Sequence, residues 1–342
     1  MTDRSTLATQ FLTSSGWGGG TLTLLAGDAS NRKYFRLRDV PNKPDAVLMD
    51  APEERGEDVQ RFIKVADFLW SQNLSAPEIY AKDIPHGFLL LEDLGDDLFS
   101  TICLDGSSKE TALYQAAADA LIALHKAPPP TLDPYAPGLM AELAAQSVDW
   151  YALGREGGVD PAKRSAVLSR MEDALSAFSK DFTVTILRDY HAQNLIWLRD
   201  REGPARVGLL DFQDAMIGHP TYDLVSLLED ARRDVSPQTQ EATLTYFIDQ
   251  TGRDPVETRA AYATMGAQRN LRILMVFARL SLHFRKPDYV GLIPRVWAHL
   301  QGNLAQPGLE GLRDAVTDAL PEPTSSHLTK LKEKCGTHPT RS

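Results

Sequence analysis

The sequence predicts an α+β protein in which a small antiparallel sheet with one helix comes first and a larger, mostly helical part comes second. Two observations predict it. Short β-prone segments bounded by turn residues occupy the first ninety residues. After residue 107 helical periodicity dominates, except between residues 182 and 210. The 342 residues, 43% of them hydrophobic, are enough for a substantial core and for two domains or two lobes.

Five segments in the N-terminal part have the composition of strands, and one helical segment separates the third from the fourth. The helix is predicted over residues 59–73, because apolar residues recur at i, i+3, i+4 and i+7 from Phe62 and Pro77 comes next. The strands are predicted over residues 21–26, 34–38, 46–49, 79–82 and 88–91. This order fits many α+β modules and does not by itself indicate a function.

Helices account for most of the chain after residue 107. They are predicted over residues 109–126, 139–154, 161–179, 222–232, 239–251, 256–284, 290–300 and 309–320. Short apolar runs consistent with strands lie at residues 184–187, 195–198 and 207–210. From Pro321 onward the sequence is polar and lacks apolar periodicity, which predicts a loosely ordered tail.

The charge balance and the termini exclude several classes of protein. The chain carries 46 acidic and 36 basic residues, a formal net charge of -10, which repels nucleic acid and anionic lipid. Residues 1–12 lack a basic segment followed by an apolar stretch, and no apolar run reaches membrane-spanning length. Cys103 and Cys335 lie far apart without nearby ligands. We therefore expect a cytoplasmic protein without a nucleic-acid or membrane partner, a disulfide framework or a zinc site.

The segment between residues 187 and 211 carries the arrangement that phosphoryl transfer requires. That reaction needs a carboxylate to orient the attacking hydroxyl and accept its proton, and oxygen ligands that hold Mg²⁺ on the nucleotide phosphates. Asp189 precedes Asn194 by five positions, and an apolar run leads directly into Asp211. We predict that Asp189 is the catalytic base and that Asn194 and Asp211 bind the metal. The alternative is that these polar residues only cap turns.

Several motifs resemble the aminoglycoside phosphotransferase superfamily. They are residues 188–194 (RDYHAQN), 210–215 (LDFQDA), 218–220 (GHP) and 222–224 (YDL). The resemblance implies a protein-kinase-like bilobal fold and the use of ATP and Mg²⁺. It divides the chain into a nucleotide-binding N-lobe, a helical C-lobe with the catalytic loop and the substrate site, and a tail, at residues 1–93, 94–320 and 321–342.

Within the superfamily, residues 27–35 (GDASNRKYF) and 47–52 (VLMDAP) look closest to the bacterial anomeric kinases of N-acetylmuramate and N-acetylglucosamine. Those kinases are cytoplasmic, act in peptidoglycan recycling and phosphorylate the anomeric hydroxyl of an amino sugar with ATP. Two alternatives stay open. One is a kinase of the same superfamily for an aminoglycoside, choline, homoserine or a fructosamine, and the other is a nucleotide-binding module without catalysis. The oligomeric state is open as well.

The resemblance also implies an adenine site at the hinge between the lobes. Residues 89–94 (LLLEDL) resemble that hinge, in which backbone groups of the connecting strand hold the base. Glu92 and Leu94 are therefore candidate nucleotide-binding residues.

The chain departs from the kinase pattern on its third predicted strand. A kinase carries a lysine there that pairs with the nucleotide phosphates, but residues 47–50 contain none. We predict that Arg32 or Lys33 supplies the charge, and that Ser30, Asn31 and nearby backbone N–H groups cradle the phosphates. The alternative is that both basic residues lie on a solvated strand edge.

Three further residues are weaker candidates for substrate binding. His191 matches a family histidine but equally fits a packed loop residue. Asp214 lies three residues beyond Asp211 and also suits a turn cap. Arg269 belongs to a polar group in an otherwise apolar helix, which suits either the wall of a sugar pocket or an exposed polar face; the group is Gln268, Arg269, Asn270 and Arg272. Asp223 is expected to be structural, bonding backbone or a basic side chain.

Overall fold

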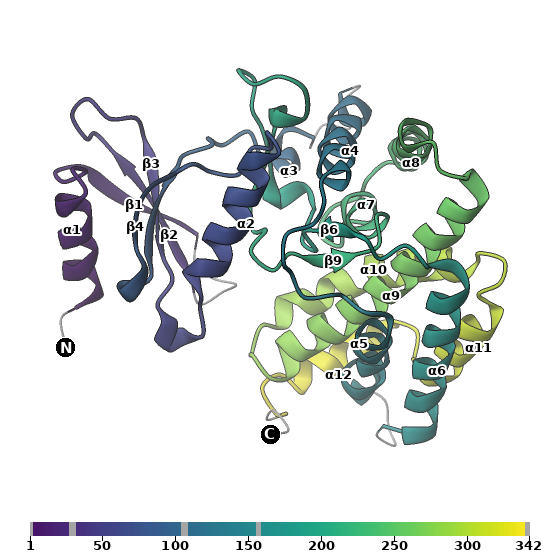
Figure 1. Cartoon of the computed structure of the whole chain (residues 1–342). Coiled ribbons are helices and arrows are strands. Elements are labelled where there is room, and N and C mark those ends of the chain that lie inside the picture. Colours follow the sequence, from purple (N-terminus) through teal and green to yellow (C-terminus); the bar gives the residue numbers. More distant parts are fainter. Residues whose placement is uncertain (1–2, 27–31, 104–108, 155–158, 339–342) are drawn as a thin grey trace. The chain divides into compact units, whose positions relative to one another are not determined.

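The computed structural model describes residues 3–26, 32–103, 109–154 and 159–338 (Figure 1). The chain divides into two compact units. Unit 1 comprises Met1–Asp105 and Ala192–Ala215, and unit 2 comprises Gly106–His191 and Met216–Ser342. The chain therefore leaves unit 1, forms the first part of unit 2, returns to unit 1 for one short segment and ends in unit 2.

Unit 1 is built on a five-stranded antiparallel sheet with the strand order β1-β2-β3-β5-β4. Each strand lies within one residue of its predicted bounds. The strands are β1 Thr21–Ala26, β2 Lys33–Arg38, β3 Ala46–Asp50, β4 Ile79–Asp83 and β5 Phe88–Glu92. Successive side chains point to opposite faces of the sheet. On one face, Leu37, Leu48 and Leu90 are buried in a single apolar cluster.

Helix α1, Arg4–Ser14, contributes Phe11 and Leu12 to that apolar cluster. The sequence analysis did not predict this helix. Its N-terminus has no side-chain cap and no acidic residue in the first turn, so the local signals that mark a helix start are missing. Packing against the sheet, rather than local propensity, stabilises it.

Helix α2, Val59–Ser71, begins at the predicted residue. The Asp58 side chain caps it by accepting a hydrogen bond from the backbone N–H of Gln60 (2.8 Å). Its buried face includes Phe62, whose ring packs against that of Phe212 with 4.7 Å between centroids. The other short helical elements of unit 1 are η1 Glu53–Arg55, η2 Ile84–His86, α3 Phe99–Ile102, η4 Ala192–Asn194 and η5 Gly203–Arg206.

The returning segment of unit 1 forms a hairpin of two short strands, β7 Leu195–Trp197 and β8 Val207–Leu209. A backbone hydrogen bond from Leu209 N to Ser75 O (2.8 Å) fastens it to the residues after α2. The sequence analysis assigned this segment to a C-lobe of residues 94–320, whereas its contacts group it with the sheet.

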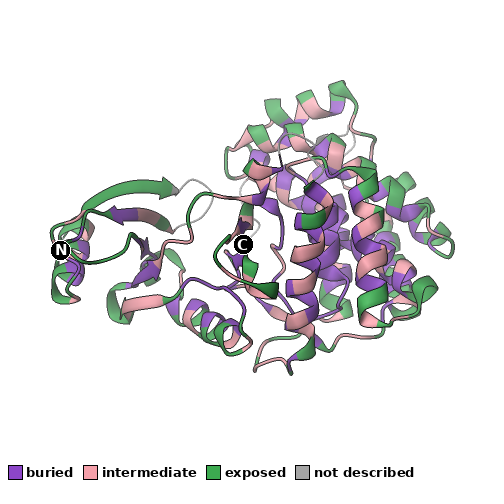
Figure 2. Ribbon diagram, turned by 90° about the horizontal axis from the view of Figure 1, so that it is seen from above, coloured by how far each residue is buried: buried purple, intermediate pink, exposed green. Residues whose placement is uncertain are grey.

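Unit 2 is mostly helical. Its helices are α4 Glu110–Lys126, α5 Pro137–Trp150, η3 Tyr151–Gly154, α6 Pro161–Phe178, α7 Tyr222–Leu228, α8 Pro237–Thr251, α9 Pro255–Leu282, η6 Pro287–Leu292, α10 Ile293–Leu304, α11 Glu310–Ala319 and α12 Ser325–Glu333. Two short antiparallel strands, β6 Val184–Ile186 and β9 Met216–Gly218, accompany them. Buried residues lie in the middle of this unit and exposed ones on its outer helices (Figure 2).

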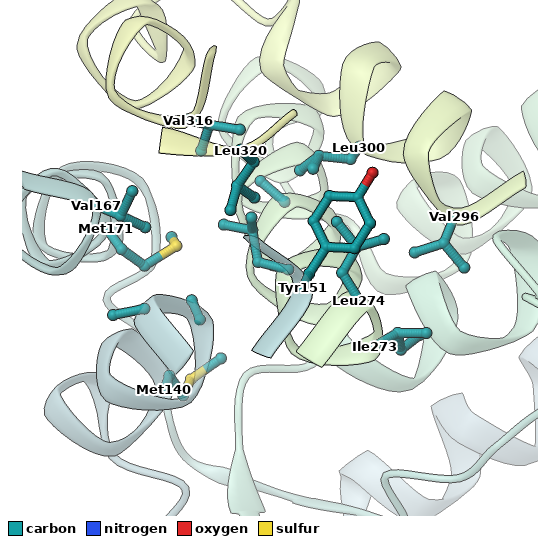
Figure 3. Close-up of a cluster of buried hydrophobic side chains, with 14 of the residues drawn as sticks. Met140, Tyr151, Val167, Met171, Ile273, Leu274, Val296, Leu300, Val316 and Leu320 are labelled. Atoms are coloured by element: carbon teal, nitrogen blue, oxygen red, sulfur yellow. The ribbon is translucent and has the colours of Figure 1, made fainter. Parts of the chain in front are cut away.

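The core of unit 2 forms around α9, a helix of 28 residues. Figure 3 shows side chains from α5, α6, α9 and α10 converging around Tyr151. Asp254 caps the start of α9 by accepting hydrogen bonds from the backbone N–H groups of Val256 and Glu257. Apolar burial on this scale is the main stabilising contribution to the unit.

The C-terminal stretch differs from the loosely ordered tail that we expected from Pro321 onward. Thr324 caps α12 by accepting a hydrogen bond from His327 N, and Leu331 is fully buried. The Lys334 ammonium donates to Leu153 O (2.7 Å). A short amphipathic helix, too brief to give a periodic signal, is stabilised here by tertiary packing.

The predicted α+β class, an antiparallel sheet with a mostly helical remainder, is confirmed. Among the helices in the described ranges, none combines the length and the apolar character that crossing a membrane requires.

Candidate active site

The predicted site residues are divided between the two units. Asn194 and Asp211 belong to unit 1, and Asp189 belongs to unit 2. Ser30 and Asn31 lie outside the described residues.

In unit 1, the two predicted metal ligands lie at the same end of the β7–β8 hairpin. Asn194 directly precedes β7, and Asp211 follows β8 by two residues. The backbone N–H of Leu210 donates to the carbonyl oxygen of Asn194 (2.9 Å), which extends the ladder past its last strand pair. Amide and carboxylate oxygens suit a hard cation that keeps several waters, so this donor set fits Mg²⁺.

Asp211 has a backbone conformation that few non-glycine residues adopt, with φ of 56°. Its neighbour Phe212 is fully buried, while the Asp211 side chain is 48% exposed. Gln213 Nε2 donates to Asp211 Oδ1 (2.8 Å). The buried ring anchors the strained residue, and its carboxylate stays accessible to a ligand.

Arg32 is the cation that the structure places beside Asp211. Its guanidinium binds Glu57 (Nε to Oε2, 2.5 Å) and lies 3.7 Å from Asp211 Oδ1. The Arg32 side chain is largely buried, whereas Lys33 is exposed and pairs across the ladder with Asp50. Burial lowers the pKa of Arg32, but Tyr34 and Glu57 outweigh it and leave the pKa raised. Of the two residues predicted to supply the missing charge, Arg32 is therefore the one near a predicted metal ligand.

The hinge candidates lie at the end of β5. The Glu92 carboxylate binds Arg201 and accepts a hydrogen bond from Glu78 N (3.2 Å), so its side chain has structural partners. The Leu94 side chain lies close to Gly208 on β8, where an added Cβ would be 3.0 Å from it. Because both side chains have partners within unit 1, this segment would bind the adenine base through its backbone N–H and C=O groups.

Sequence reasoning missed a second arginine in unit 1. Arg36 is 8% exposed and binds two aspartates that follow β5. Its Nη2 donates to Asp93 (3.0 Å), and its Nη1 donates to Asp96 (2.9 Å). Arg32, Tyr34 and Arg36 are spaced two residues apart at β2, so their side chains lie on the same face of the sheet. No local signal marks this role, because the partners lie about sixty residues away along the chain.

In unit 2, a buried carboxylate holds the loop that presents Asp189. Asp223 accepts hydrogen bonds from the backbone N–H groups of Leu187 (2.6 Å) and Arg188 (2.8 Å). Burial raises the pKa of Asp223 to about 7, although these two bonds oppose the shift. The structural role expected for Asp223, bonding to backbone, is confirmed. Arg188 takes a positive φ of 71°, a strained conformation that these bonds help to hold.

His191 and Arg269 have the contacts of packed residues. His191 is 4% exposed, and its Nε2 lies 3.1 Å from Arg232 Nη1. Burial, followed by Arg232, lowers the pKa of His191 to about 4, so the ring is neutral at pH 7. Arg269 is also buried and donates to Ser226 Oγ (2.8 Å). Asp214 is half-buried near the turn that the Ala215 backbone closes.

The polar group in α9 is not an exposed face. Gln268 and Asn270 are fully buried, and Asn270 Nδ2 donates to Glu229 Oε2 (2.8 Å). Burial raises the pKa of Glu229, and the amides of Asn270 and Asn303 oppose the shift. Arg272 differs from these residues. Burial lowers its pKa, but Tyr222, Tyr135 and Asp189 outweigh burial and leave the pKa raised.

Comparison with known proteins identifies the family of the chain. Residues 21–261 match the model of the phosphotransferase enzyme family. The N-acetylmuramate/N-acetylglucosamine kinase of Caulobacter vibrioides is 36% identical over 350 residues, covering 91% of this chain and 95% of that protein. The kinase of the same name from Pseudomonas aeruginosa is 33% identical over 311 residues, covering 87% and 88%. A choline/ethanolamine kinase family protein from Mesorhizobium loti matches in structure with a TM-score of 0.61 at 15% identity, covering 96% of this chain and 99% of that one, which confirms the predicted kinase-like fold. The chain belongs to the phosphotransferase enzyme family.

Proposed function

We propose that the protein is an ATP- and Mg²⁺-dependent kinase that phosphorylates the anomeric hydroxyl of N-acetylmuramate and N-acetylglucosamine. The observation that carries this proposal is the similarity of most of the chain to relatives named for these two sugars. The residues of both units fit the chemistry. We further propose that the enzyme acts in the cytoplasm, in peptidoglycan recycling, as the motifs of the sequence suggest.

Asp189 is the proposed base. A kinase carboxylate at this position orients the attacking hydroxyl and accepts its proton, and most of its effect comes from positioning. The two backbone bonds to Asp223 hold the residues before Asp189 in one conformation. A loop fixed in this way loses little entropy when substrate binds.

Asn194 and Asp211 would hold the metal, because they lie at one end of a hairpin and offer oxygen donors. When bound, Mg²⁺ neutralises charge on the transferred phosphate. The carboxylate of Asp211 is exposed and free to approach a metal ion, while the buried ring of the next residue, Phe212, fixes the backbone that carries it.

Arg32 would replace the strand lysine of other kinases. In those enzymes a glutamate positions the lysine on the phosphates. Here Glu57 binds Arg32 just before α2, and the guanidinium remains within 3.7 Å of Asp211. An arginine offers several donors to phosphate oxygens and keeps its charge at any physiological pH. Ser30, Asn31 and the backbone near Glu92 and Leu94 complete the proposed nucleotide site.

A panel assay tests the proposal. ATP consumption should depend on N-acetylmuramate or N-acetylglucosamine, and kanamycin, choline, homoserine and a fructosamine should each support less than about a hundredth of that rate. A preference for any compound of the second group would replace the proposed substrate. ATP binding without transfer to any compound would leave a nucleotide-binding module as the function.

A further inference from the structure

The segment of unit 1 that follows β5 is strongly acidic. Residues 92–97 (EDLGDD) carry four carboxylates within six positions, and these like charges repel one another. A fixed conformation of the segment therefore depends on cations from elsewhere in the unit. Three arginines supply them: Arg36 from β2, and Arg199 and Arg201 from the loop between β7 and β8.

Arg36 binds two of these carboxylates from a buried position. Its Nη2 donates to Asp93 Oδ1 (3.0 Å) and to Asp96 Oδ1 (2.8 Å), and its Nη1 donates to Asp96 Oδ2 (2.9 Å). The hydrogen bonds from Arg36 are the main reason why the pKa of Asp96 is lowered. A planar guanidinium with several donors can bridge two carboxylates in this way, so Arg36 ties residue 93 to residue 96.

A turn lies between these two aspartates. Gly95 has a φ of 87°, a conformation that glycine adopts without steric cost. Its N–H donates to Asp93 Oδ1 (3.0 Å), the same oxygen that accepts from Arg36. The Asp93 carboxylate therefore joins the turn to β2.

The other side of the segment is held by the β7–β8 hairpin. Arg201 pairs with Glu92, and Arg199 Nε donates to Asp97 Oδ2 (2.8 Å). Both side chains of the second pair are exposed, with 70% of Arg199 and 41% of Asp97 accessible, so that pair contributes little. Arg36 is shielded from solvent and is expected to contribute most to the conformation of the segment.

The backbone of Leu94 is left open by these contacts. Among the residues that the structure describes, neither its N–H nor its C=O has a hydrogen-bond partner in the chain. Its side chain lies close to Gly208 on β8. A donor and an acceptor side by side match the edge of adenine, which has an acceptor at N1 and an amino donor at C6. Hypoxanthine reverses both groups, because it has an N1–H donor and a C6 oxygen.

Resting on the proposed nucleotide site, we infer that Arg36 is a positioning residue that fixes the backbone of Leu94 for the adenine base and thereby makes the protein select ATP over nucleotides with another base. Arg36 acts through the segment and not on the nucleotide, since its donors are used by Asp93 and Asp96. A backbone donor and acceptor that are already in place bind the base without the cost of ordering the segment.

The test measures the Kd of the full-length protein, with Mg²⁺, for ATP, inosine triphosphate and inorganic tripolyphosphate. Inosine triphosphate carries hypoxanthine in place of adenine, and tripolyphosphate has no base. The wild type should bind ATP about tenfold or more tightly than inosine triphosphate, because hypoxanthine leaves both Leu94 groups unpaired. Arg36→Gln should raise the Kd of ATP about tenfold, close to that of inosine triphosphate, and should change the Kd of tripolyphosphate less than about twofold.

Three further variants sharpen the comparison. Arg38→Gln is the matched control, because Arg38 ends the same strand at the surface, and it should keep all three Kd values. Arg36→Lys should resemble Arg36→Gln, since one ammonium cannot reproduce the bridge between two carboxylates. Asp96→Asn changes a side chain that is 74% exposed, so it should fold and should reduce the preference for ATP about threefold. It decides the question if Arg36→Gln does not fold.

The inference is overturned if Arg36→Gln and Asp96→Asn keep the wild-type preference for ATP over inosine triphosphate. Equal weakening of ATP and tripolyphosphate would overturn it too, because that result shows a general loss of structure. If the wild type binds ATP but phosphorylates neither sugar, the proposed function fails and the role of Arg36 is unaffected. If it phosphorylates the sugars but binds ATP and inosine triphosphate equally, only the inference fails.

Discussion

The Arg32 guanidinium lies 3.7 Å from the Asp211 carboxylate, and Glu57 holds it there. The Arg32 guanidinium would compensate for the absence of a lysine on β3, because it is a permanent cation beside a predicted metal ligand. It also explains why Arg32 and not Lys33 is the stronger candidate, since the Lys33 side chain is exposed.

Replacement of Arg32 tests this relationship. We expect Arg32→Gln to raise the KM for ATP about tenfold or more and to lower kcat, because a charge-assisted bond to phosphate is lost. Steady-state kinetics with varied ATP measures it. Arg38→Gln is the matched control, because Arg38 ends the same strand and pairs with Asp45 at the surface. Unchanged ATP kinetics in Arg32→Gln would remove Arg32 from the nucleotide site.

The metal ligands make a separate prediction. Asp211→Asn should raise the Mg²⁺ concentration needed for half-maximal activity and lower kcat about a hundredfold or more, since a neutral amide binds the cation less well. Asp200→Asn, at an exposed position between β7 and β8, should leave both values unchanged. Activity measured over a range of Mg²⁺ concentrations tests both expectations. An Asp211→Asn enzyme with the wild-type Mg²⁺ requirement would contradict the assignment of Asp211 as a metal ligand.

We predict that the free energy of unfolding depends on pH through Asp223. Its pKa rises from 3.8 to about 7 in the folded protein, so between these values the folded state binds more protons than the unfolded chain. The contribution of Asp223 to the free energy of unfolding is therefore full at low pH and declines as the pH rises toward 7, by at most about 4 kcal/mol. Asp223→Asn should abolish this decline.

Denaturant unfolding of the wild type and of Asp223→Asn at pH 5 and pH 8 measures the effect as a double difference. The comparison is needed because the lowered pKa of His191 acts in the opposite direction, adding stability as the pH rises. Parallel pH profiles for the two proteins would show that Asp223 does not titrate as described.

His191 should act through packing. Because its pKa is about 4, the ring is neutral at the working pH and accepts a hydrogen bond from Arg232. His191→Gln is expected to lower the free energy of unfolding by about 1 kcal/mol and to keep the shape of the pH–rate profile. Loss of one limb of that profile would instead identify the histidine as an acid or base.

Patterns within a few residues made most of the fold predictable. The strands of unit 1 and the start of α2 are explained by alternation and by the Asp58 cap, and they match within one residue. Helix α1 was not predictable in this way, because its stability comes from the sheet that Phe11 and Leu12 cover. The short helix α12 depends on distant packing in the same manner.

The site residues were predictable only where the number of residues between them is characteristic of a kinase. The five-residue interval from Asp189 to Asn194 and the strand before Asp211 identified the candidate residues. The partners of Arg32 and Arg36 lie far along the chain, so only the folded chain brings them together. Likewise, the polar residues of α9 were ambiguous, because a helix surrounded by other helices buries even its polar side.

The most direct test of the central claim is a phosphorus NMR spectrum of the product formed from N-acetylmuramate, ATP and Mg²⁺ by the wild type and by Asp189→Asn. The account predicts a sugar phosphate coupled to the anomeric proton for the wild type. It predicts no such product for Asp189→Asn, although that variant should still bind ATP. A phosphate on any other sugar position, or an Asp189→Asn enzyme as active as the wild type, would contradict the account.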